Sequence, residues 1–168
     1  MTIATAGGLG IAFTPNDREV FNRNGATATI PGDLVQFNIL RTGTETTDGS
    51  YGLETSCWAN TIVPTGTAGM MIGGMYAVVK RGAADNLKHV VQVSGKVDAK
   101  VTNDNGAGVL PVGSFLYAGN DLELHGHSTL QPGRKILAIL QTQLGNGATS
   151  VVEVDFDGIH GFGSTSVT

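Results

Sequence analysis

The sequence predicts an all-β protein, a small β-barrel or β-sandwich. No segment repeats its apolar residues with the 3.6-residue period of a helix. Gly, Pro, Asn or Asp interrupts the apolar pattern every several residues, which is typical of short strands joined by turns. Residues 149–156 alternate strictly between two faces. The predicted core residues of this strand are Val152, Val154 and Phe156, and the predicted solvent-facing ones are Glu153, Asp155 and Asp157.

Apolar runs bounded by turn residues predict the other strands in chain order. The predicted strands are residues 26–30, 33–40, 75–81, 88–101, 114–118, 121–125, 135–144 and 149–156. Both faces of the run 135–144 are apolar, so we expect that strand to be central or packed on both sides. The Gly- and Met-rich run 61–75 is too broken for a helix and is predicted to be a loop.

A chain of 168 residues fits one domain, and the sequence shows neither an internal repeat nor a linker between two domains. The two ends differ from the middle, because each spaces isolated apolar residues among Gly, Asn, Thr and Ser. We therefore predict an N-terminal attachment arm over 1–25, a single β domain over 26–158 and a Gly-rich C-terminal tail over 159–168. The apolar residues predicted to contact another chain are Ile11, Phe13, Val20, Phe21, Ile159 and Phe162.

Composition excludes several classes of partner. The net charge is −4 and the Lys and Arg residues are scattered, whereas a nucleic-acid surface needs a basic patch. No apolar stretch approaches the roughly 20 residues that cross a bilayer, and the N-terminus lacks the pattern of a signal peptide. Charged residues make up only 14% of the chain, against about 25% in a typical soluble domain. This low charge favours a β protein with much surface in contact with other chains.

The stretch LELHGHST, residues 122–129, is the strongest candidate for chemistry. On a strand, His125 and His127 point to the same face, as the two histidines of a metal-binding His-x-His pair do. No third or fourth ligand with a recognisable spacing accompanies them, and Gly126 with the following Ser-Thr favours the end of a strand. The sequence therefore predicts a solvated strand-to-turn segment, with no metal and no cofactor.

The remaining candidates for chemistry have simpler structural readings. The glycines of residues 66–74 do not form a phosphate-binding pattern. Cys57 next to Trp58 has no obvious base and is more typical of a small buried side chain than of a nucleophile. The acidic residues of 153–157 are expected to form a solvated face. No catalytic site emerges, so the chain is predicted not to be an enzyme.

Four segments follow one another in a recognisable order: PGDLVQFN (31–38), QVSGKVDAKV (92–101), LPVGSFLYAGNDLEL (110–124) and GRKILAILQTQLGNGATSVVEVDFDG (133–158). This order resembles the capsid decoration, or cement, proteins of tailed bacteriophages. The chain departs from that pattern in residues 41–75 and in its long N-terminal segment. The resemblance implies a β-tulip-like domain that forms a homotrimer on the outer surface of the phage head. Its partner would be the major capsid protein, and its location the virion.

Two other classes of protein remain as alternatives. A cupin-type β-barrel would use His125 and His127 as metal ligands, but it needs a third His and a Glu at fixed spacing. A carbohydrate-binding β-sandwich would use Trp58 and Tyr51, but it needs several exposed aromatic residues, and aromatics make up only 6% of the chain.

Overall fold

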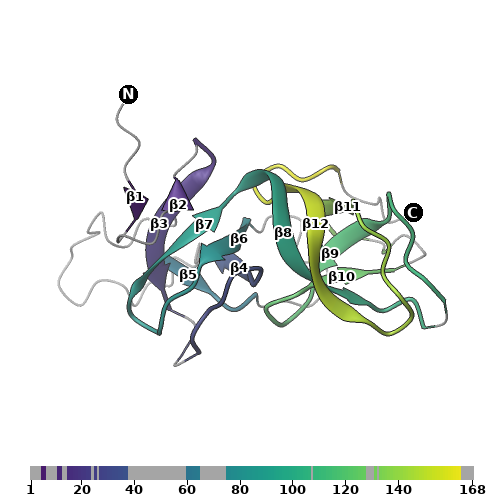
Figure 1. The fold of residues 1–168 in the computed structure, drawn as a ribbon, viewed down its shortest axis with the longest axis horizontal. Helices are drawn as coiled ribbons and strands as arrows, with labels where there is room; N and C mark the ends of the chain where they lie inside the picture. Colours follow the sequence, from purple (N-terminus) through teal and green to yellow (C-terminus); the bar gives the residue numbers. More distant parts are fainter. Residues whose placement is uncertain are drawn as a thin grey trace.

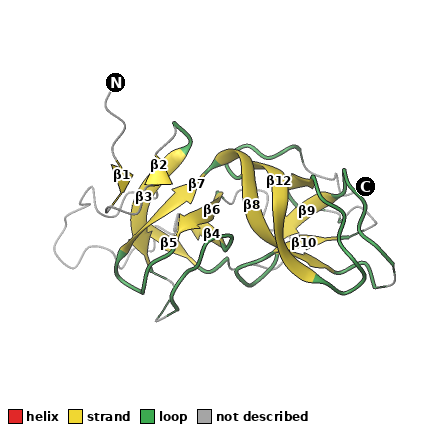
Figure 2. Cartoon of the chain, in the orientation of Figure 1, coloured by secondary structure: helices red, strands yellow, loops and turns green. Residues whose placement is uncertain are grey.

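The computed structural model describes residues 5–6, 11–12, 15–23, 25, 27–37, 60–64, 75–106, 108–127, 131 and 133–163. Every regular element in this part of the chain is a strand (Figure 2). The strands are β1 (Thr5–Ala6), β2 (Ile11–Ala12), β3 (Asp17–Asn22), β4 (Leu34–Phe37), β5 (Asn60–Ile62), β6 (Tyr76–Arg81), β7 (Lys88–Gln92), β8 (Ser94–Asn103), β9 (Phe115–Ala118), β10 (Leu124–Gly126), β11 (Ala138–Leu140) and β12 (Thr149–Asp157). The predicted all-β class is confirmed. Over the described ranges, no helix long and apolar enough to cross a membrane is present.

The strands form two closed five-stranded barrels that lie side by side along the long axis of the molecule (Figure 1). The first barrel has the strand order β3-β5-β4-β6-β7, and the second has the order β10-β8-β12-β11-β9. The short strands β1 and β2 pair only with each other in the described sheets. The region predicted as one β domain, 26–158, therefore contains a whole barrel and most of another.

The two barrels have the same topology. In each, the first strand pairs parallel with the third, β3 with β5 and β8 with β10. All other neighbours are antiparallel and follow the same order around the barrel. Strand β3 thus corresponds to β8, β4 to β9, β5 to β10, β6 to β11 and β7 to β12. The chain therefore contains an internal structural repeat of two barrels.

The repeat is visible in the sequence once the topology is known. Residues 20–26 read VFNRNGA and residues 101–107 read VTNDNGA. Asn22 ends β3, and its side-chain amide donates to the carbonyls of Thr27 and Ala83. Asn103 ends β8, and its amide donates to the carbonyls of Gly108 and Gly145 in the matching loops. The prediction that the chain holds no internal repeat was wrong, because only short turn and cap residues carry it.

The predicted arm boundary at residue 25 is wrong for residues 17–22. These residues form β3, which closes the first barrel by pairing with β5 and β7. Val20 is 3% exposed and belongs to the core of the first barrel together with Val35 and Phe37. The predicted strand 26–30 was also wrong, because its described residues, 27–30, form a loop.

No linker separates the barrels. The predicted single strand 88–101 is in fact β7 of the first barrel followed at once by β8 of the second, with only Val93 between them (Figure 1). The chain passes from one barrel to the next in extended conformation. This direct passage explains why the sequence shows no Pro-, Gly- or Ser-rich boundary there.

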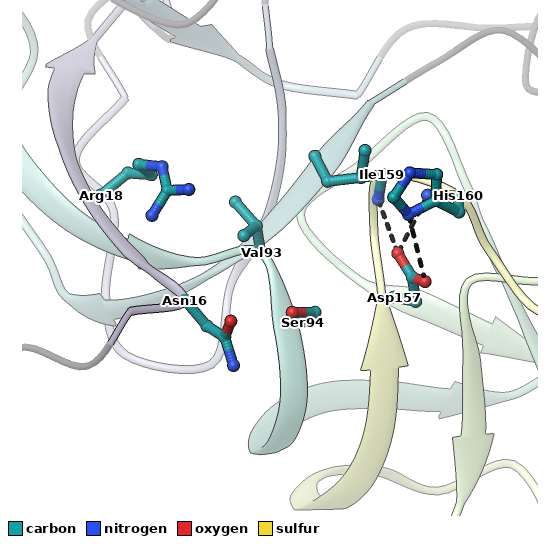
Figure 3. Close-up of a pocket in the computed structure, with 7 residues that line it drawn as sticks. All are labelled: Asn16, Arg18, Val93, Ser94, Asp157, Ile159 and His160. Carbon is teal, nitrogen blue, oxygen red and sulfur yellow. Dashed lines mark hydrogen bonds and ion pairs between the residues drawn. The ribbon is translucent and has the colours of Figure 1, made fainter.

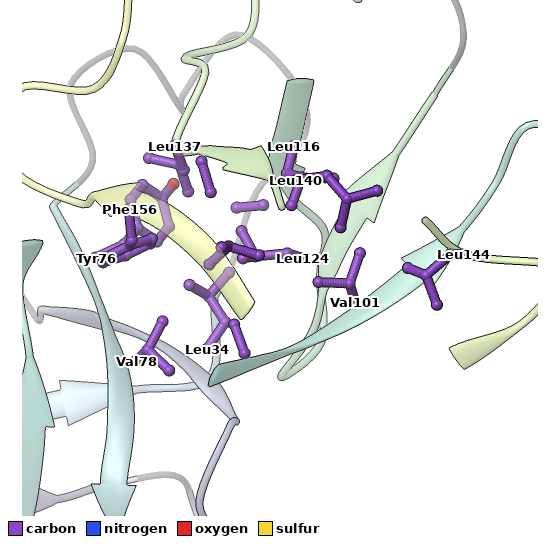
Figure 4. Close-up of a cluster of buried hydrophobic side chains, with 14 of the residues drawn as sticks. Leu34, Tyr76, Val78, Val101, Leu116, Leu124, Leu137, Leu140, Leu144 and Phe156 are labelled. Atoms are coloured by element: carbon purple, nitrogen blue, oxygen red, sulfur yellow. The ribbon is translucent and has the colours of Figure 1, made fainter. Parts of the chain in front are cut away.

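The outer face of β4 and β6 packs against the second barrel. Leu34, Tyr76 and Val78 point away from the first core and are fully buried among the apolar residues of the second, including Phe156 and Leu124 (Figure 4). Burial of these apolar side chains stabilises the contact between the two barrels.

Backbone hydrogen bonds join the same two faces. Leu34 N donates to Leu122 O at 2.8 Å, and Tyr76 N donates to Gly158 O at 2.9 Å. A Cβ atom at Gly158 would lie 1.9 Å from the Tyr76 carbonyl oxygen, so only glycine allows the backbones to approach so closely.

The first part of the predicted C-terminal tail belongs to the fold. Phe162 N donates to Ile136 O at 2.8 Å, and Ile136 N donates to Gly163 O at 2.9 Å. Ile159 is partly buried against the core of the first barrel. Residues 159–163 are therefore held by both barrels, and residues 164–168 lie outside the described ranges.

Candidate functional sites

The histidine segment forms a compact ionic cluster at one end of the second barrel. His125 lies in β10, and parallel pairing with β8 brings it beside Asp104, the residue after β8. Its Nδ1 lies 2.5 Å from an oxygen of Asp104, and its Nε2 lies 2.9 Å from an oxygen of Asp121. His127 is more distant, with its Nε2 3.9 Å from Asp104.

These contacts favour a protonated His125. Burial lowers the pKa of the imidazole, but hydrogen bonds to Asp121 and Asp104 outweigh burial and raise the pKa above its usual value. A ring with a carboxylate at each nitrogen donates through both, which only the imidazolium can do. Burial lowers the pKa of His127, so the pKa values of the two neighbouring histidines are shifted in opposite directions.

The cluster also contains atoms that could bind a metal ion. Ligand atoms of Asp121, Glu123 and His125 lie within 4.8 Å of one another. All three are engaged by protein groups, however. Glu123 accepts from Lys100 Nζ at 2.7 Å and from the hydroxyl of Thr102, and Asp121 accepts from His125. The charged groups of this cluster thus form hydrogen bonds and ion pairs with one another.

The prediction of a solvated strand-to-turn segment needs correction here. The side chain of His125 is only 15% exposed, and two carboxylates flank it. Asp104 was missed because it lies 21 residues upstream and becomes a neighbour only through β8–β10 pairing. The repeat gives no signal for Asp104, because the first barrel has Arg23 at the equivalent position.

His89 is the other histidine removed from solvent. It lies in β7 of the first barrel, and its ring nitrogens contact the hydroxyls of Thr29 at 3.0 Å and Thr61 at 2.8 Å. Burial lowers its pKa to about 4. The neutral ring thus ties the loop before β4 to β5 and has a structural role.

A groove of about 550 Å³ lies at the junction of the barrels, where β7 passes into β8 (Figure 3). Its charged groups hold the local backbone. Arg18 donates to the carbonyls of Pro15 and Asp17, and a carboxylate oxygen of Asp157 accepts from the backbone N–H groups of Ile159 and His160. The groove therefore resembles a structural junction more than a reaction site.

The predicted contact residues whose side chains the structure describes do not gather on one surface. Val20 is in the core, and Phe21 is partly buried on the first barrel with Arg23 and Lys88 each 5.5 Å from its ring centroid. Phe162 is 40% exposed beside the second barrel. The side chain of Ile11 and all of Phe13 lie outside the described residues. Tyr51, Cys57, Trp58 and residues 66–74 lie outside them too.

An exposed apolar surface on the second barrel was missed. Phe115 at the start of β9 is 37% exposed, and Val112 in the preceding turn is 58% exposed. Ile139 in β11 pairs with Phe115 and is partly exposed. The sequence signal was the run 135–144, which was expected to be packed on both sides.

Comparison of the chain with protein-family models, curated proteins and solved structures gives no significant match. Function is therefore inferred from the sequence resemblance and from the geometry of the chain itself.

Proposed function

We propose that this chain is a structural virion protein, a decoration or cement protein of a tailed-phage head, and not an enzyme. In this proposal it binds the outer surface of the head as a homotrimer. It contacts the major capsid protein and stabilises the expanded lattice.

The proposal is supported chiefly by where the segments that resemble decoration proteins lie in the fold. PGDLV and PVGSFLY lead into β4 and β9, which occupy the same position in the two barrels. The resembling segments are thus the turn-and-strand units from which both barrels are built. The resemblance therefore lies in the turns and strands that build the barrels and not in a catalytic site. This is expected of a protein whose role is structural.

The charged side chains support a binding role. The ionisable groups of the histidine cluster and of the junction groove pair with one another or with backbone groups. A net charge of −4 suits the outer face of a head, away from packaged DNA. Apolar side chains remain exposed on both barrels, among them Leu87 and Val151.

The stabilising mechanism is mass action. A ligand that binds the expanded lattice and not the unexpanded one shifts the equilibrium toward the expanded form. A trimer that reaches several capsid subunits multiplies modest contacts through effective concentration. The attachment arm of this proposal is now limited to residues 1–14, because residue 17 begins the first barrel.

The test is binding to expanded and unexpanded heads prepared without this protein. We expect saturable binding to expanded heads, little binding to unexpanded ones, and a higher disruption temperature for decorated heads. Antibody labelling of intact particles should place the protein outside. A matched variant lacking residues 2–14 keeps all strands of both barrels and should bind expanded heads more weakly.

Three results would change the proposal in different ways. Absence of binding to expanded heads by a folded full-length chain would reject the decoration role. Equal occupancy of the full-length and shortened chains at limiting protein would leave the role intact and remove the arm from it. Stoichiometric metal in the purified protein would instead favour the cupin-type alternative.

A further inference from the structure

The junction groove is lined by both barrels and by the residues that follow β12 (Figure 3). Asn16 and Arg18 form one wall, Ile159 and His160 form the opposite wall, and Val93 lies between them. Its volume of about 550 Å³ is in the range of ligand pockets, which often lie between domains. The position and the size of the groove are therefore those of a binding site.

Three polar side chains of the junction groove have hydrogen-bond donors that the protein does not use. Across the described ranges, no hydrogen bond or ion pair involves the side chain of Asn16 or of Ser94. Arg18 donates to two backbone carbonyls through Nη1 alone, so its Nε and Nη2 keep their N–H groups for other acceptors. A guanidinium, an amide and a hydroxyl group thus converge on the groove from the start of β3 and the start of β8.

The carboxylate of the junction groove is already engaged. One oxygen of Asp157 accepts from the backbone N–H groups of Ile159 at 3.1 Å and His160 at 2.9 Å. Its other oxygen lies 3.7 Å from His160 Nδ1, and the charge of the buried Lys135 interacts with the same carboxylate. The open positions in the groove are therefore donors, and they favour a ligand atom that accepts hydrogen bonds and carries negative charge.

The backbone holds these donors in place in the unliganded chain. Val93 N donates to Asn16 O at 2.9 Å, and Gly158 N donates to Val93 O at 3.0 Å, so both walls are fixed to the same residue. A Cβ atom at Gly95, where φ is +93°, would lie 3.4 Å from Nδ2 of Asn16. The amide of Asn16 thus lies against the backbone next to Ser94. A site arranged in this way loses little conformational entropy when a ligand binds.

The other residues of the groove narrow the class of ligand. Val93 is buried and Ile159 packs against the core of the first barrel, so the base of the groove is apolar. A phosphate group carries close to two negative charges at neutral pH and would lie near Asp157, which repels it. A carboxylate carries one charge and has an aliphatic stem that the apolar base can contact. The volume exceeds that of a carboxylate group alone, so the groove also has room for the peptide backbone around it.

We propose that the junction groove binds an acidic polypeptide segment of a partner protein. The carboxylate of a Glu or Asp side chain accepts hydrogen bonds from Arg18, Asn16 and Ser94, and its apolar neighbours contact Val93 and Ile159. Recognition of such a segment goes beyond the capsid role and does not depend on it. Its test uses no phage heads, so either proposal can fail without the other.

The first test is a titration of the isotope-labelled full-length chain followed by nuclear magnetic resonance. The probe is the blocked peptide acetyl-Ala-Val-Glu-Val-Ala-amide, and the matched control peptide has Gln in place of Glu. We expect saturable shifts of the backbone amide signals of Ser94, Gly95 and His160. The Glu peptide should bind about tenfold more tightly than the Gln peptide, because only its carboxylate forms charged hydrogen bonds with the neutral donors.

Three outcomes of this titration would overturn the proposal. The first is the absence of shifts at the highest soluble concentration of the Glu peptide. The second is equal affinity for the two peptides. The third is binding of acetate as tightly as the Glu peptide, which would indicate a site for small anions and not for a polypeptide.

The second test alters the wall of the groove. Asn16→Asp should weaken binding of the Glu peptide by about tenfold, because it replaces a donor by a second carboxylate. Asn146→Asp is the matched control, since it adds the same charge in the exposed turn before β12, at the end of that strand remote from Asp157, and it should leave the affinity unchanged. Ser94→Ala removes one donor without adding charge and should also weaken binding. Unchanged affinity in Asn16→Asp and Ser94→Ala chains with native melting behaviour would place the peptide elsewhere and refute the assignment.

Discussion

Asn103 offers the sharpest test of how the second barrel is held closed. Its side-chain amide donates to the carbonyls of Gly108 at 3.1 Å and Gly145 at 2.7 Å, and its Oδ1 accepts from Asn105 N at 2.9 Å. The side chain is 3% exposed and joins the end of β8 to two separate loops. Replacing it by alanine removes all three hydrogen bonds at once.

The magnitude follows from those bonds. A hydrogen bond of this kind contributes about 1 kcal/mol net, and the carbonyls of the exposed Gly108 and Gly145 can regain water. Asn103→Ala should therefore lower the free energy of unfolding by about 3 kcal/mol. For a chain of this length, that corresponds to a melting temperature roughly 6–12 °C lower. Asn22→Ala, the equivalent change in the first barrel, removes the two hydrogen bonds that its amide donates to Thr27 and Ala83 and should cost at least about 2 kcal/mol.

The assay is guanidinium unfolding followed by circular dichroism, with Asn146→Ala as an exposed control that should change stability by less than about 0.5 kcal/mol. Asn103→Asp adds a second check. It keeps the acceptor but places a carboxylate oxygen against two carbonyls, which raises the pKa of the new carboxyl group in the folded state. Its deficit should be largest at pH 7 and shrink as pH falls toward the unfolded value of about 3.9. A cost below about 1 kcal/mol for Asn103→Ala, or a deficit independent of pH for Asn103→Asp, would refute the reasoning.

Three further outcomes are expected. Gly158→Ala should destabilise the fold by about 1–3 kcal/mol because its Cβ would meet the Tyr76 carbonyl, whereas Gly145→Ala, whose Cβ would have 4.0 Å of space, should be nearly neutral in thermal unfolding. His89 binds its proton in the folded state only near pH 4, so the native chain should lose about 3 kcal/mol of stability as pH falls from about 6.5 to about 4, and a flat stability profile there would contradict its burial. The pKa of His125 is raised, so its contribution to stability is lost as pH rises, and His125→Gln should cost more stability at pH 6 than at pH 9. Added zinc should not raise the melting temperature of the native chain.

Local patterns in the sequence predicted much of the fold. The alternation in 149–156 placed Val154 and Phe156 in the core and left Glu153 exposed, as the structure has them. Most predicted strands from residue 33 onward overlap observed ones. The barrel strands that were missed are β3 and β5, whose apolar residues are few and whose polar residues Asn22 and Thr61 are buried through hydrogen bonds and not by hydrophobicity.

The candidate sites were predicted less well. The sequence drew attention to His125 and His127, but the carboxylate of Asp104 follows β8 and comes beside His125 only through the pairing of β8 with β10. The exposed pair Phe115 and Ile139 was not recognised, because a strand that is apolar on both faces was expected to find its second partner within the same domain.

The sequence alone determined the all-β class, the turns and the inward faces of the strands, because these depend on period-two patterning and on the backbone preferences of neighbouring residues. Only the tertiary structure decided that the chain closes into two equivalent barrels. Closure depends on pairings such as β3 with β7 and β8 with β12, which join residues far apart in sequence and leave no periodic signal along the chain. The same long-range pairings bury the outward-facing Leu34 of β4 and leave its counterpart in β9, Phe115, 37% exposed, a difference that the apolar residues of the two strands do not encode.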